Sequence, residues 1–480
     1  MKRRIYVTTS IPYVNAAPHV GFALELVQAD ALARASRLLG REVRFQTGTD
    51  ENAAKNVLAA AELNLATQEL VDRNSHKFHE LLTALNVSAD DFLRTTEDRH
   101  RRGVHALWQG LRPGDIYRKQ YRGLYCTGCE DFYLEKDLVD GRCPEHGTRP
   151  VEVAEENYFF RLSAYQRQIE DLLAGGRLQV VPETRRNEVL SFVRRGLADI
   201  SVSRPAGRAG GWGIRVPDDD SQVIYVWIDA LINYISGPGF GNGQDWRQWW
   251  SDDVEKVHVI GKNVWKFHAA YWPGLLLSAG LPLPDRIVVH GFVTAEGRKI
   301  SKSLGKAVDP FQCVEAFGPD AVRYYLLRAI PPFDDGDFSL ARLRRLYNTD
   351  LANGLGNLVS RLTTLCQRAG FERDQAAETP GAPKDYLAAL VRYEFDKAAA
   401  ALWQLVADLN RRIETLRPWE LLKSDDRKRL KEHLHRWLAE LHRLAYWLEP
   451  LLPRTSERIL HILSQSPPKA AECLFPRLTA

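Results

Sequence analysis

The chain has 480 residues, 45% of them hydrophobic and 26% charged, which fits a large soluble enzyme of several domains. Six cysteines are too few for a disulfide scaffold, and no apolar run approaches the roughly 20 residues of a membrane-spanning helix. The net charge of +4 excludes little, although the excess of positive charge lies within residues 341–480. We therefore expect a cytoplasmic protein with no membrane segment.

Residues 1–115 alternate between strand and helix patterns. The expected strands are residues 5–9, 42–48 and 91–96, and the expected helices are residues 20–40, one from about residue 52, residues 66–86, and a further one after residue 96. Such alternation predicts a parallel sheet covered by helices, with ligands bound at the carboxyl ends of its strands.

A short string, PHVGF at residues 18–22, stands where the first expected strand turns into a helix. A helix N-terminus offers unpaired backbone N–H groups, which suit a phosphate. Gly21 lets a nucleotide approach the backbone closely, and the imidazole of His19 can donate to phosphate oxygens. The string alone could equally be an ordinary helix start with a surface histidine.

Residues 116–221 interrupt the alternation and contain four grouped ligand-type residues. Cys126 and Cys129 form CTGC, and Cys143 and His146 form CPEH. Two residues inside each pair allow both side chains of a turn to reach one ion, so the spacing predicts a tetrahedral zinc site over residues 123–150. Four protein ligands leave no position for water, and the zinc is therefore expected to be structural. The alternative is four unrelated residues.

Strand patterns return at residues 223–229, 257–261 and 286–292, with an aromatic-rich helix expected at residues 263–280. The last strand leads into RKISKSLG, residues 298–305. A loop with Lys299, Ser301 and Lys302 can neutralise charge on a departing pyrophosphate. It could also be a solvated basic turn.

PHVGF and KISKS, in this order and each on the expected element, resemble the two nucleotide-binding signatures of the class I aminoacyl-tRNA synthetases. The resemblance narrows to the methionyl-tRNA synthetase family, because SIPYVN, YVWIDALINY and NVWKFHAAYW match segments of that family's amino-acid pocket. It implies an enzyme that forms an aminoacyl adenylate from Mg²⁺-bound ATP.

In this family, the methionine pocket is formed by aromatic and small apolar residues. Carried over residue by residue, the resemblance places ten residues at the substrate, with Asp50 at the α-amino group and the others around the side chain: Ile11, Tyr13, Asp50, Trp227, Ala230, Leu231, Tyr234, Val264, His268 and Trp272. A thioether gains from contact with aromatic rings, so the chemistry agrees. Without the resemblance, these rings would be interpreted as a buried aromatic cluster.

From about residue 345 onward, strand patterns vanish and helical stretches dominate. The family reads the tRNA anticodon here, and the matching positions are Asn357, Arg361 and Trp419. Asn357 and Arg361 are four residues apart and share a helix face, while an exposed tryptophan can stack on a splayed base. The basic charge of this region is consistent with RNA, or with a solvated surface.

The expected fold is α/β: a Rossmann-like parallel-sheet catalytic domain with an inserted zinc-binding connective domain and an all-α anticodon-binding domain. The expected segments are residues 1–115 and 222–295 for the two halves of the catalytic domain, 116–221 for the insertion, 296–344 for the lysine-bearing loop and stem-contact region, and 345–480 for the helical domain. Expected cofactors are one structural Zn²⁺ and Mg²⁺ with ATP. The expected partners are ATP, methionine and tRNA(Met), and a monomer is expected.

Some positions depart from the family pattern. Phe22 and Asn52 stand where histidines are usual, Lys306 replaces an asparagine, and Ile300 replaces a methionine with little change of volume. The departures keep two alternatives open: a diverged ligase that passes the activated amino acid to an acceptor other than tRNA, and a non-catalytic RNA-binding paralogue. The second would be expected to lose His19, Asp50 or the two lysines, and all four are present.

Overall fold

The structure is a computed structural model that describes residues 2–126, 131–133, 135, 138–144, 147–243, 245–295, 298–299, 308–371, 380–423, 426–465, 468 and 473–478. The chain forms two compact units. Unit 1 comprises Met1–Pro18, Arg41–Glu80 and Ala89–Val289, and unit 2 comprises His19–Gly40, Leu81–Ser88 and His290–Ala480.

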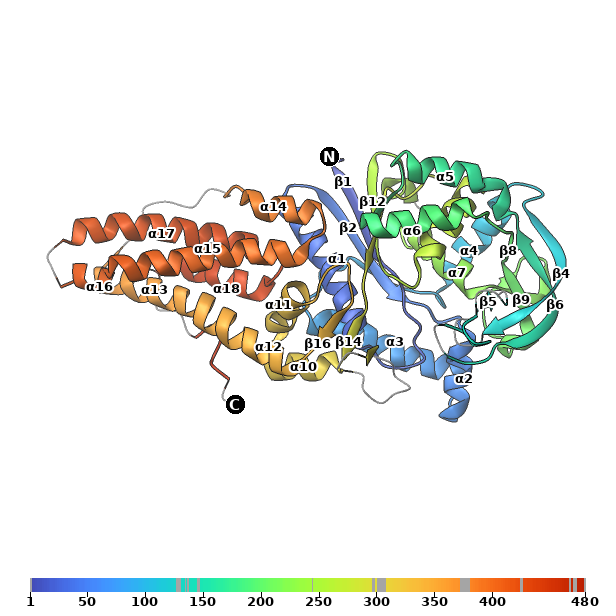
Figure 1. Ribbon diagram of the computed structural model, residues 1–480, viewed down its shortest axis with the longest axis horizontal. Coiled ribbons are helices and arrows are strands. Elements are labelled where there is room, and N and C mark those ends of the chain that lie inside the picture. Colours follow the sequence, from blue (N-terminus) through green and yellow to red (C-terminus); the bar gives the residue numbers. More distant parts are fainter. Residues whose placement is uncertain are drawn as a thin grey trace. The chain divides into compact units, whose positions relative to one another are not determined.

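A six-stranded sheet forms the centre of unit 1, in the order β3-β2-β1-β12-β13-β7. Its strands are β1 (Arg4–Thr9), β2 (Glu42–Thr49), β3 (Asp91–Arg94), β7 (Gln179–Val181), β12 (Val254–Gly261) and β13 (Arg286–His290). The pairs β3–β2, β2–β1, β1–β12 and β13–β7 are parallel, and β1, β2 and β12 lie side by side in Figure 1. β12 is buried along its whole length, as expected for a central strand of a parallel sheet with both faces covered. The predicted parallel sheet is confirmed.

The helices of this part of the chain follow the sequence prediction only in part. They are α2 (Ala54–Glu62), α3 (Thr67–Ala84), α4 (Asp98–Gly110), α5 (Gln166–Ala174), α6 (Glu183–Arg194), α7 (Val226–Leu231), α8 (Asn233–Ser236) and α9 (Trp272–Ser278), with a π-helical turn, η5 (Phe267–Tyr271), directly before α9. The helix expected at residues 263–280 is therefore present, and it contains the π turn.

Two antiparallel sheets occupy the segment expected to be an insertion. β4 (Ile116–Cys126) pairs with β6 (Val151–Phe160), flanked by β5 (Asp131–Tyr133) and β8 (Ile200–Ser201). The second sheet contains β9 (Ser203–Pro205), β10 (Arg215–Val216) and β11 (Asp219–Ile224). The three-residue strand β7 comes from the same stretch of sequence but joins the parallel sheet beside β13, a difference from the prediction. A strand this short leaves too little pattern to detect.

The strand predicted at residues 223–229 is wrong in its second half. β11 ends at Ile224, and α7 begins at Val226, where the N–H of Asp229 bonds the carbonyl of Tyr225 at 3.0 Å. A short, continuous apolar run fits a buried strand and a buried helix equally well, so its periodicity could not decide between them.

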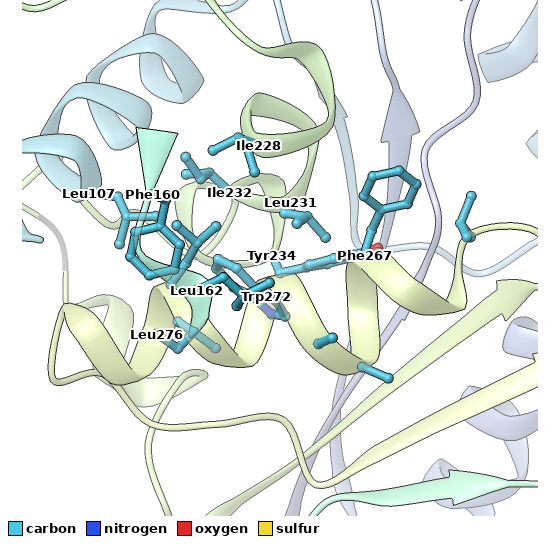
Figure 2. Close-up of a cluster of buried hydrophobic side chains, with 14 of the residues drawn as sticks. Leu107, Phe160, Leu162, Ile228, Leu231, Ile232, Tyr234, Phe267, Trp272 and Leu276 are labelled. Atoms are coloured by element: carbon cyan, nitrogen blue, oxygen red, sulfur yellow. The ribbon is translucent and has the colours of Figure 1, made fainter. Parts of the chain in front are cut away.

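The hydrophobic core of unit 1 joins the helices to the antiparallel sheet. Figure 2 shows Leu107 of α4, Phe160 of β6, Leu231 of α7 and Trp272 of α9 converging on one cluster. Trp272 is fully buried. Buried aromatic rings of this size contribute a large share of the apolar area removed from water.

Unit 2 consists mostly of helices, which confirms the predicted helical C-terminal region. They are α1 (Val20–Leu38), α10 (Pro310–Phe317), α11 (Pro319–Ala329), α12 (Leu340–Leu346), α13 (Asn357–Ala369), α14 (Lys384–Val391), α15 (Phe395–Leu416), α16 (Pro418–Leu421), α17 (Arg427–Leu448) and α18 (Pro453–Leu463), with a π-helical segment, η7 (Tyr347–Gly356), before α13. Helices α13, α15 and α17 pack against one another (Figure 1). Among the described residues, no helix is long and apolar enough to cross a membrane.

A small sheet and a buried ion pair complete unit 2. β14 (Val293–Ala295) pairs with β15 (Arg298–Lys299) and with β16 (Gly336–Phe338). Arg323 of α11 is fully buried and lies 2.7 Å from the carboxylate of Asp30 on α1. This pair fastens α1, which is early in the sequence, to the helices of the C-terminal half.

Candidate active site

The N-terminus of α1 is capped by the side chain of His19. The imidazole Nδ1 accepts a hydrogen bond of 3.0 Å from the backbone N–H of Gly21. Because Nδ1 is the acceptor, the proton of a neutral imidazole is on Nε2. The cap therefore fixes His19 as an Nε2–H donor at a helix N-terminus, where the helix dipole also favours an anion.

Gly21 is required by the position of that imidazole. A Cβ at this position would lie 2.8 Å from Cε1 of His19 and 2.9 Å from its Nδ1. Any larger residue would force the ring away from the helix terminus. Gly21, which was predicted to admit a nucleotide, thus also leaves the space that the imidazole of His19 occupies.

The second signature is described only in part. The backbone of Lys299 belongs to β15, where it pairs with Thr294 of β14. Ser301 and Lys302 lie outside the described residues, as do Ile300 and Lys306. Five residues after the signature, the carbonyl of Val308 accepts a hydrogen bond of 3.2 Å from the N–H of Val20. Val308 therefore lies at the first turn of α1.

All ten residues predicted at the methionine site belong to unit 1. Tyr13 and Asp50 form an isolated parallel bridge between the segments that follow β1 and β2, and the N–H of Asp50 bonds the carbonyl of Pro12 at 2.9 Å. Asp50 is buried. The structure therefore brings the predicted ammonium-binding carboxylate beside the predicted pocket residue Tyr13, at the carboxyl edge of the sheet.

The predicted methionine site contains a cluster of aromatic rings. Three of these rings form its first part. Tyr13 lies 5.6 Å from Trp227 of α7, measured between ring centroids, and Trp227 stacks on Phe267 at 4.2 Å with an interplanar angle of 8°. Phe267 was missed by the sequence analysis. Its position directly before His268, in a segment already rich in aromatic residues, was the available signal.

Tyr234 and His268 form the second part, and their hydrogen bonds define a single tautomer. His268 Nδ1 faces the carbonyl of Val264 at 2.9 Å and must donate, so its Nε2 accepts the 2.7 Å bond from the hydroxyl of Tyr234. Burial lowers the pKa of His268 to about 4. The ring is consequently neutral near pH 7, and Tyr234 is held by an uncharged partner.

Trp272 and His258 pack around the same tyrosine. The ring centroid of Tyr234 lies 6.2 Å from that of Trp272 and 4.0 Å from that of His258 (Figure 2 shows Tyr234 beside Trp272). Burial, followed by the neighbouring His268, lowers the pKa of His258 well below its usual value. Both histidines are therefore uncharged near pH 7, so the rings around Tyr234 place no charge beside a thioether.

The remaining predicted pocket residues are placed by the same elements. Ala230 and Leu231 are buried on α7, which packs against η5, and buried Val264 accepts the bond from His268. Ile11 is half-buried, two residues beyond β1.

Asn52 connects this part of the site to α7. Its side-chain amide donates to the carboxylate of Asp229 at 2.7 Å and to the carbonyl of Thr95 at 3.2 Å. Asn52 thus has a structural role of its own where the family usually has a histidine. In unit 2, Phe22 is buried on α1 and offers no hydrogen-bonding group.

Two of the four predicted zinc ligands are described. Cys126, at the end of β4, and Cys143 are both 1% exposed. Thr148 contacts both, because its hydroxyl lies 3.8 Å from Sγ of Cys126 and its carbonyl accepts from the N–H of Cys143 at 2.8 Å. Cys129 and His146 lie outside the described residues, among which no group of three or more potential metal ligands occurs. Two buried cysteines that both contact Thr148, one through its sulfur and one through its backbone, fit the donor set of a zinc site.

The predicted anticodon residues lie in unit 2. Asn357 and Arg361 are one turn apart on α13, and Asn357 is exposed. Trp419, on α16, is 36% exposed, and the guanidinium of Arg361 lies 5.9 Å from its ring centroid. An exposed indole with a cation over its face can stack on an unpaired base.

Comparisons with known proteins point to one family. A family model described as tRNA synthetases class I (M) matches residues 5–151 and 134–363. A methionine--tRNA ligase of Brucella suis is 40% identical over 481 residues, covering 96% of this chain and 92% of that protein. One from Mycobacterium tuberculosis is 41% identical over 487 residues, with the same coverage of 96% and 92%. The solved structure of Mycobacterium tuberculosis methionyl-tRNA synthetase in complex with methionyl-adenylate matches with a TM-score of 0.89 and 39% identity, covering 97% of this chain and 95% of that one.

Proposed function

This chain belongs to the methionyl-tRNA synthetases, a family of class I aminoacyl-tRNA synthetases, and we propose which of its residues carry the methionine--tRNA ligase reaction. The observation that carries the assignment is the similarity to methionine--tRNA ligases over nearly the whole chain. In the first step, the carboxylate of methionine attacks the α-phosphorus of ATP, which gives methionyl adenylate and releases pyrophosphate. In the second, the terminal ribose of tRNA(Met) attacks the adenylate carbonyl, giving the ester and AMP.

The phosphates are proposed to bind at the N-terminus of α1. Nε2–H of His19 donates to a phosphate oxygen, and Gly21 allows the phosphates to approach the helix terminus. Lys299, Ser301 and Lys302 supply charge and hydrogen bonds to the departing pyrophosphate. Mg²⁺ that accompanies ATP neutralises further phosphate charge. All of these contributions are electrostatic, and no protein group forms a covalent bond.

Methionine is proposed to bind at the aromatic cluster of unit 1. Asp50 pairs with the α-ammonium group and orients the carboxylate for attack. The rings of Tyr13, Trp227, Tyr234 and Trp272 accept the thioether through sulfur–aromatic contacts. Because His268 is neutral, binding the apolar side chain beside it does not require the desolvation of a charge.

Zinc is proposed as a structural ion held by Cys126, Cys129, Cys143 and His146. The support is the ligand spacing together with the burial of both described cysteines beside Thr148. The ion would tie down residues 123–150, which are short of apolar residues. Elemental analysis of the full-length protein should find one zinc per chain, and Cys143→Ser should lose most of it. A purified active protein without zinc would contradict the assignment.

The tRNA is proposed to be recognised by Asn357, Arg361 and Trp419, which supports tRNA as the acceptor over the two alternatives. The deciding experiment charges tRNA(Met) and a transcript with a changed anticodon, using methionine and ATP. We expect esterification of the first and a large loss with the second. Pyrophosphate exchange without charging would favour a non-tRNA acceptor, and RNA binding without exchange would favour a non-catalytic paralogue.

The enzyme is proposed to work in the cytoplasm, because tRNA charging takes place there. It is proposed to be a monomer. Light scattering at micromolar concentration should give a mass near the 54.5 kDa of one chain.

A further inference from the structure

A buried acid–imidazole pair joins α1 to the end of β13. Glu25 lies on α1, between one and two turns after His19, and His290 is the last residue of β13. Nε2 of His290 lies 2.8 Å from Oε2 of Glu25. The side chains are 6% and 5% exposed, so water does not screen the pair. Nothing in the proposed reaction uses either residue.

The geometry requires a proton between the two residues. Nδ1 of His290 lies 2.7 Å from the carbonyl oxygen of Gly291, which can only accept, so Nδ1 carries a hydrogen. Nε2 then has only a lone pair, unless a second proton is present. A carboxylate would repel that lone pair at 2.8 Å, so the bond forms only as imidazolium with carboxylate, or as neutral imidazole with a carboxylic acid.

The chain next to His290 is tightly constrained. A Cβ at Gly291 would lie 2.1 Å from the carbonyl oxygen of Asp334, so two backbone segments pass in close contact there. The N–H of Phe292 bonds Asp335 at 2.9 Å, and β14 begins at the following residue. A shift of His290 would therefore be transmitted to β14 and, through its pairing, to β15 with Lys299.

Helix α1 packs against β14. It also contacts the chain at Val308, whose carbonyl accepts the hydrogen bond from the N–H of Val20. Among the described residues, the pair between Glu25 and His290 thus ties the helix that carries His19 to the segment that leads into β14 and β15. The backbone bond from Val20 to Val308 is a further tie, close to the helix terminus.

We propose that Glu25 and His290 are positioning residues, whose proton-sharing bond sets the spacing between His19 and the β14–β15 strands for ATP. This inference rests on the proposed function, because it assigns His19 and Lys299 to the phosphates. It predicts a change in the KM for ATP or in kcat. The KM for methionine should stay the same, because the predicted methionine site lies in unit 1.

The test compares two replacements of Glu25 by methionine-dependent pyrophosphate exchange. Glu25→Met fills a similar volume but cannot accept from His290. We expect it to raise the KM for ATP, or lower kcat, by about tenfold to a hundredfold, the cost of a misplacement on the order of 1 Å. The KM for methionine should change less than about twofold, because no bond near that site is altered.

Glu25→Gln is the conservative variant. Its side-chain amide can donate a proton to Nε2 of a neutral His290, so the bond is kept without a charge. We expect its KM for ATP within about threefold of the parent value, a rescue that a purely volume-based role would not produce. Ser36→Ala, which alters another buried polar residue far along α1, is the matched control and should leave both KM values unchanged.

The outcomes separate this inference from the proposed function. If the parent protein gives no methionine-dependent exchange, the function itself fails. If it does, and Glu25→Met melts like the parent with both the KM for ATP and kcat unchanged, only the positioning role is overturned. Should Glu25→Met not fold, His290→Leu breaks the same bond from the other side. Independently, a loss in Glu25→Gln as large as that expected for Glu25→Met would also contradict the proposal.

Discussion

At the scale of single residues, the clearest dependence is that of His19 on Gly21. The imidazole folds over the helix terminus because position 21 has no side chain, and a Cβ there would lie 2.8 Å from the ring. The first prediction follows from this contact. Gly21→Ala should lose the histidine cap, worth about 1 kcal/mol, and regain about 1 kcal/mol of helix propensity, so stability should hardly change.

Activity should respond differently, because the displaced ring removes one donor from the phosphates. Pyrophosphate exchange by Gly21→Ala is expected to fall about a hundredfold. Gly110→Ala is the matched control, since nothing lies within 4 Å of a Cβ at that helical glycine. Equal rates for both variants would show that His19 does not act where its cap places it.

His268 provides a second prediction, on stability against pH. Its folded-state pKa is about 4 because of burial, below the usual value of 6.5. As pH falls from 6.5 towards 4, the unfolded chain therefore binds a proton that the folded protein does not, and stability is lost over that window. Between pH 7 and pH 5 the loss from this residue is about 2 kcal/mol.

Urea unfolding of the parent and of His268→Gln at both pH values measures that loss. The variant should show a smaller decrease in unfolding free energy, by about 2 kcal/mol, because glutamine does not titrate. His258, buried beside it with a lowered pKa, should contribute a similar decrease in both proteins. Identical pH dependence in the two proteins would mean that His268 is not desolvated as described.

The sequence predicted the positions of these residues better than their contacts. His19 and Gly21 were predicted from a short string at the end of a strand, and Asp50 from the resemblance to the family. The stack of Phe267 on Trp227 was missed, because it joins two elements that are separated by 40 residues and no local pattern reports it. Contacts of this kind follow from packing and not from periodicity.

At the scale of elements, the tie between α1 and α11 deserves a direct test. Arg323 is fully buried, bonds the carbonyls of Leu85, Pro450 and Leu451, and pairs with Asp30. Burial alone would raise the pKa of Asp30. The positive charges of Arg323 and Arg34 lower it by more, so the pKa of Asp30 lies below its usual value. The carboxylate therefore remains charged and needs a cation.

Arg323→Met should destabilise unit 2 by about 3–5 kcal/mol, because it leaves part of a buried charge uncompensated. Arg454→Met, which alters an exposed arginine of α18, should change stability by less than about 0.5 kcal/mol. Thermal unfolding followed by circular dichroism measures both. A melting curve of Arg323→Met that coincides with that of the parent would show that the pair does not hold these helices together.

Element prediction from the sequence succeeded where a run was long or amphipathic. Strands β1, β2, β12 and β13 of the parallel sheet and the long helices α15 and α17 have such runs. It failed at residues 226–229, where four apolar and acidic residues form the start of α7, and at β7, which has three residues. In both cases the tertiary partner decides the structure, and the local sequence does not contain that partner.

At the scale of the whole molecule, the predicted site residues are distributed over both units. The predicted methionine residues lie in unit 1, while His19, Lys299 and the predicted anticodon residues lie in unit 2. The compact units do not follow chain order, since α1 belongs with residues beyond His290. Sequence periodicity could not reveal this grouping, because it depends on buried pairs such as that between Asp30 and Arg323.

Because the predicted anticodon residues and the predicted methionine residues lie in different units, substitutions of the anticodon residues should lower tRNA charging and leave adenylation unchanged. Trp419→Ala and Arg361→Ala should each lower kcat/KM for tRNA charging about tenfold to a hundredfold, the value of one stacked base. Methionine-dependent pyrophosphate exchange should be unchanged. Lys397→Ala, which removes one exposed positive charge near the start of α15, is the control for general electrostatic attraction. A loss of charging in Lys397→Ala equal to that in Arg361→Ala would indicate nonspecific RNA attraction.

The most direct test of the account is amino-acid-dependent pyrophosphate exchange by the full-length protein with each of the twenty amino acids. The uncharged aromatic cluster around Tyr234, together with the helix terminus at His19, predicts exchange that is strong with methionine and at least about a hundredfold weaker with every other amino acid. Exchange that is strongest with an amino acid other than methionine, or absent with all twenty, would contradict it.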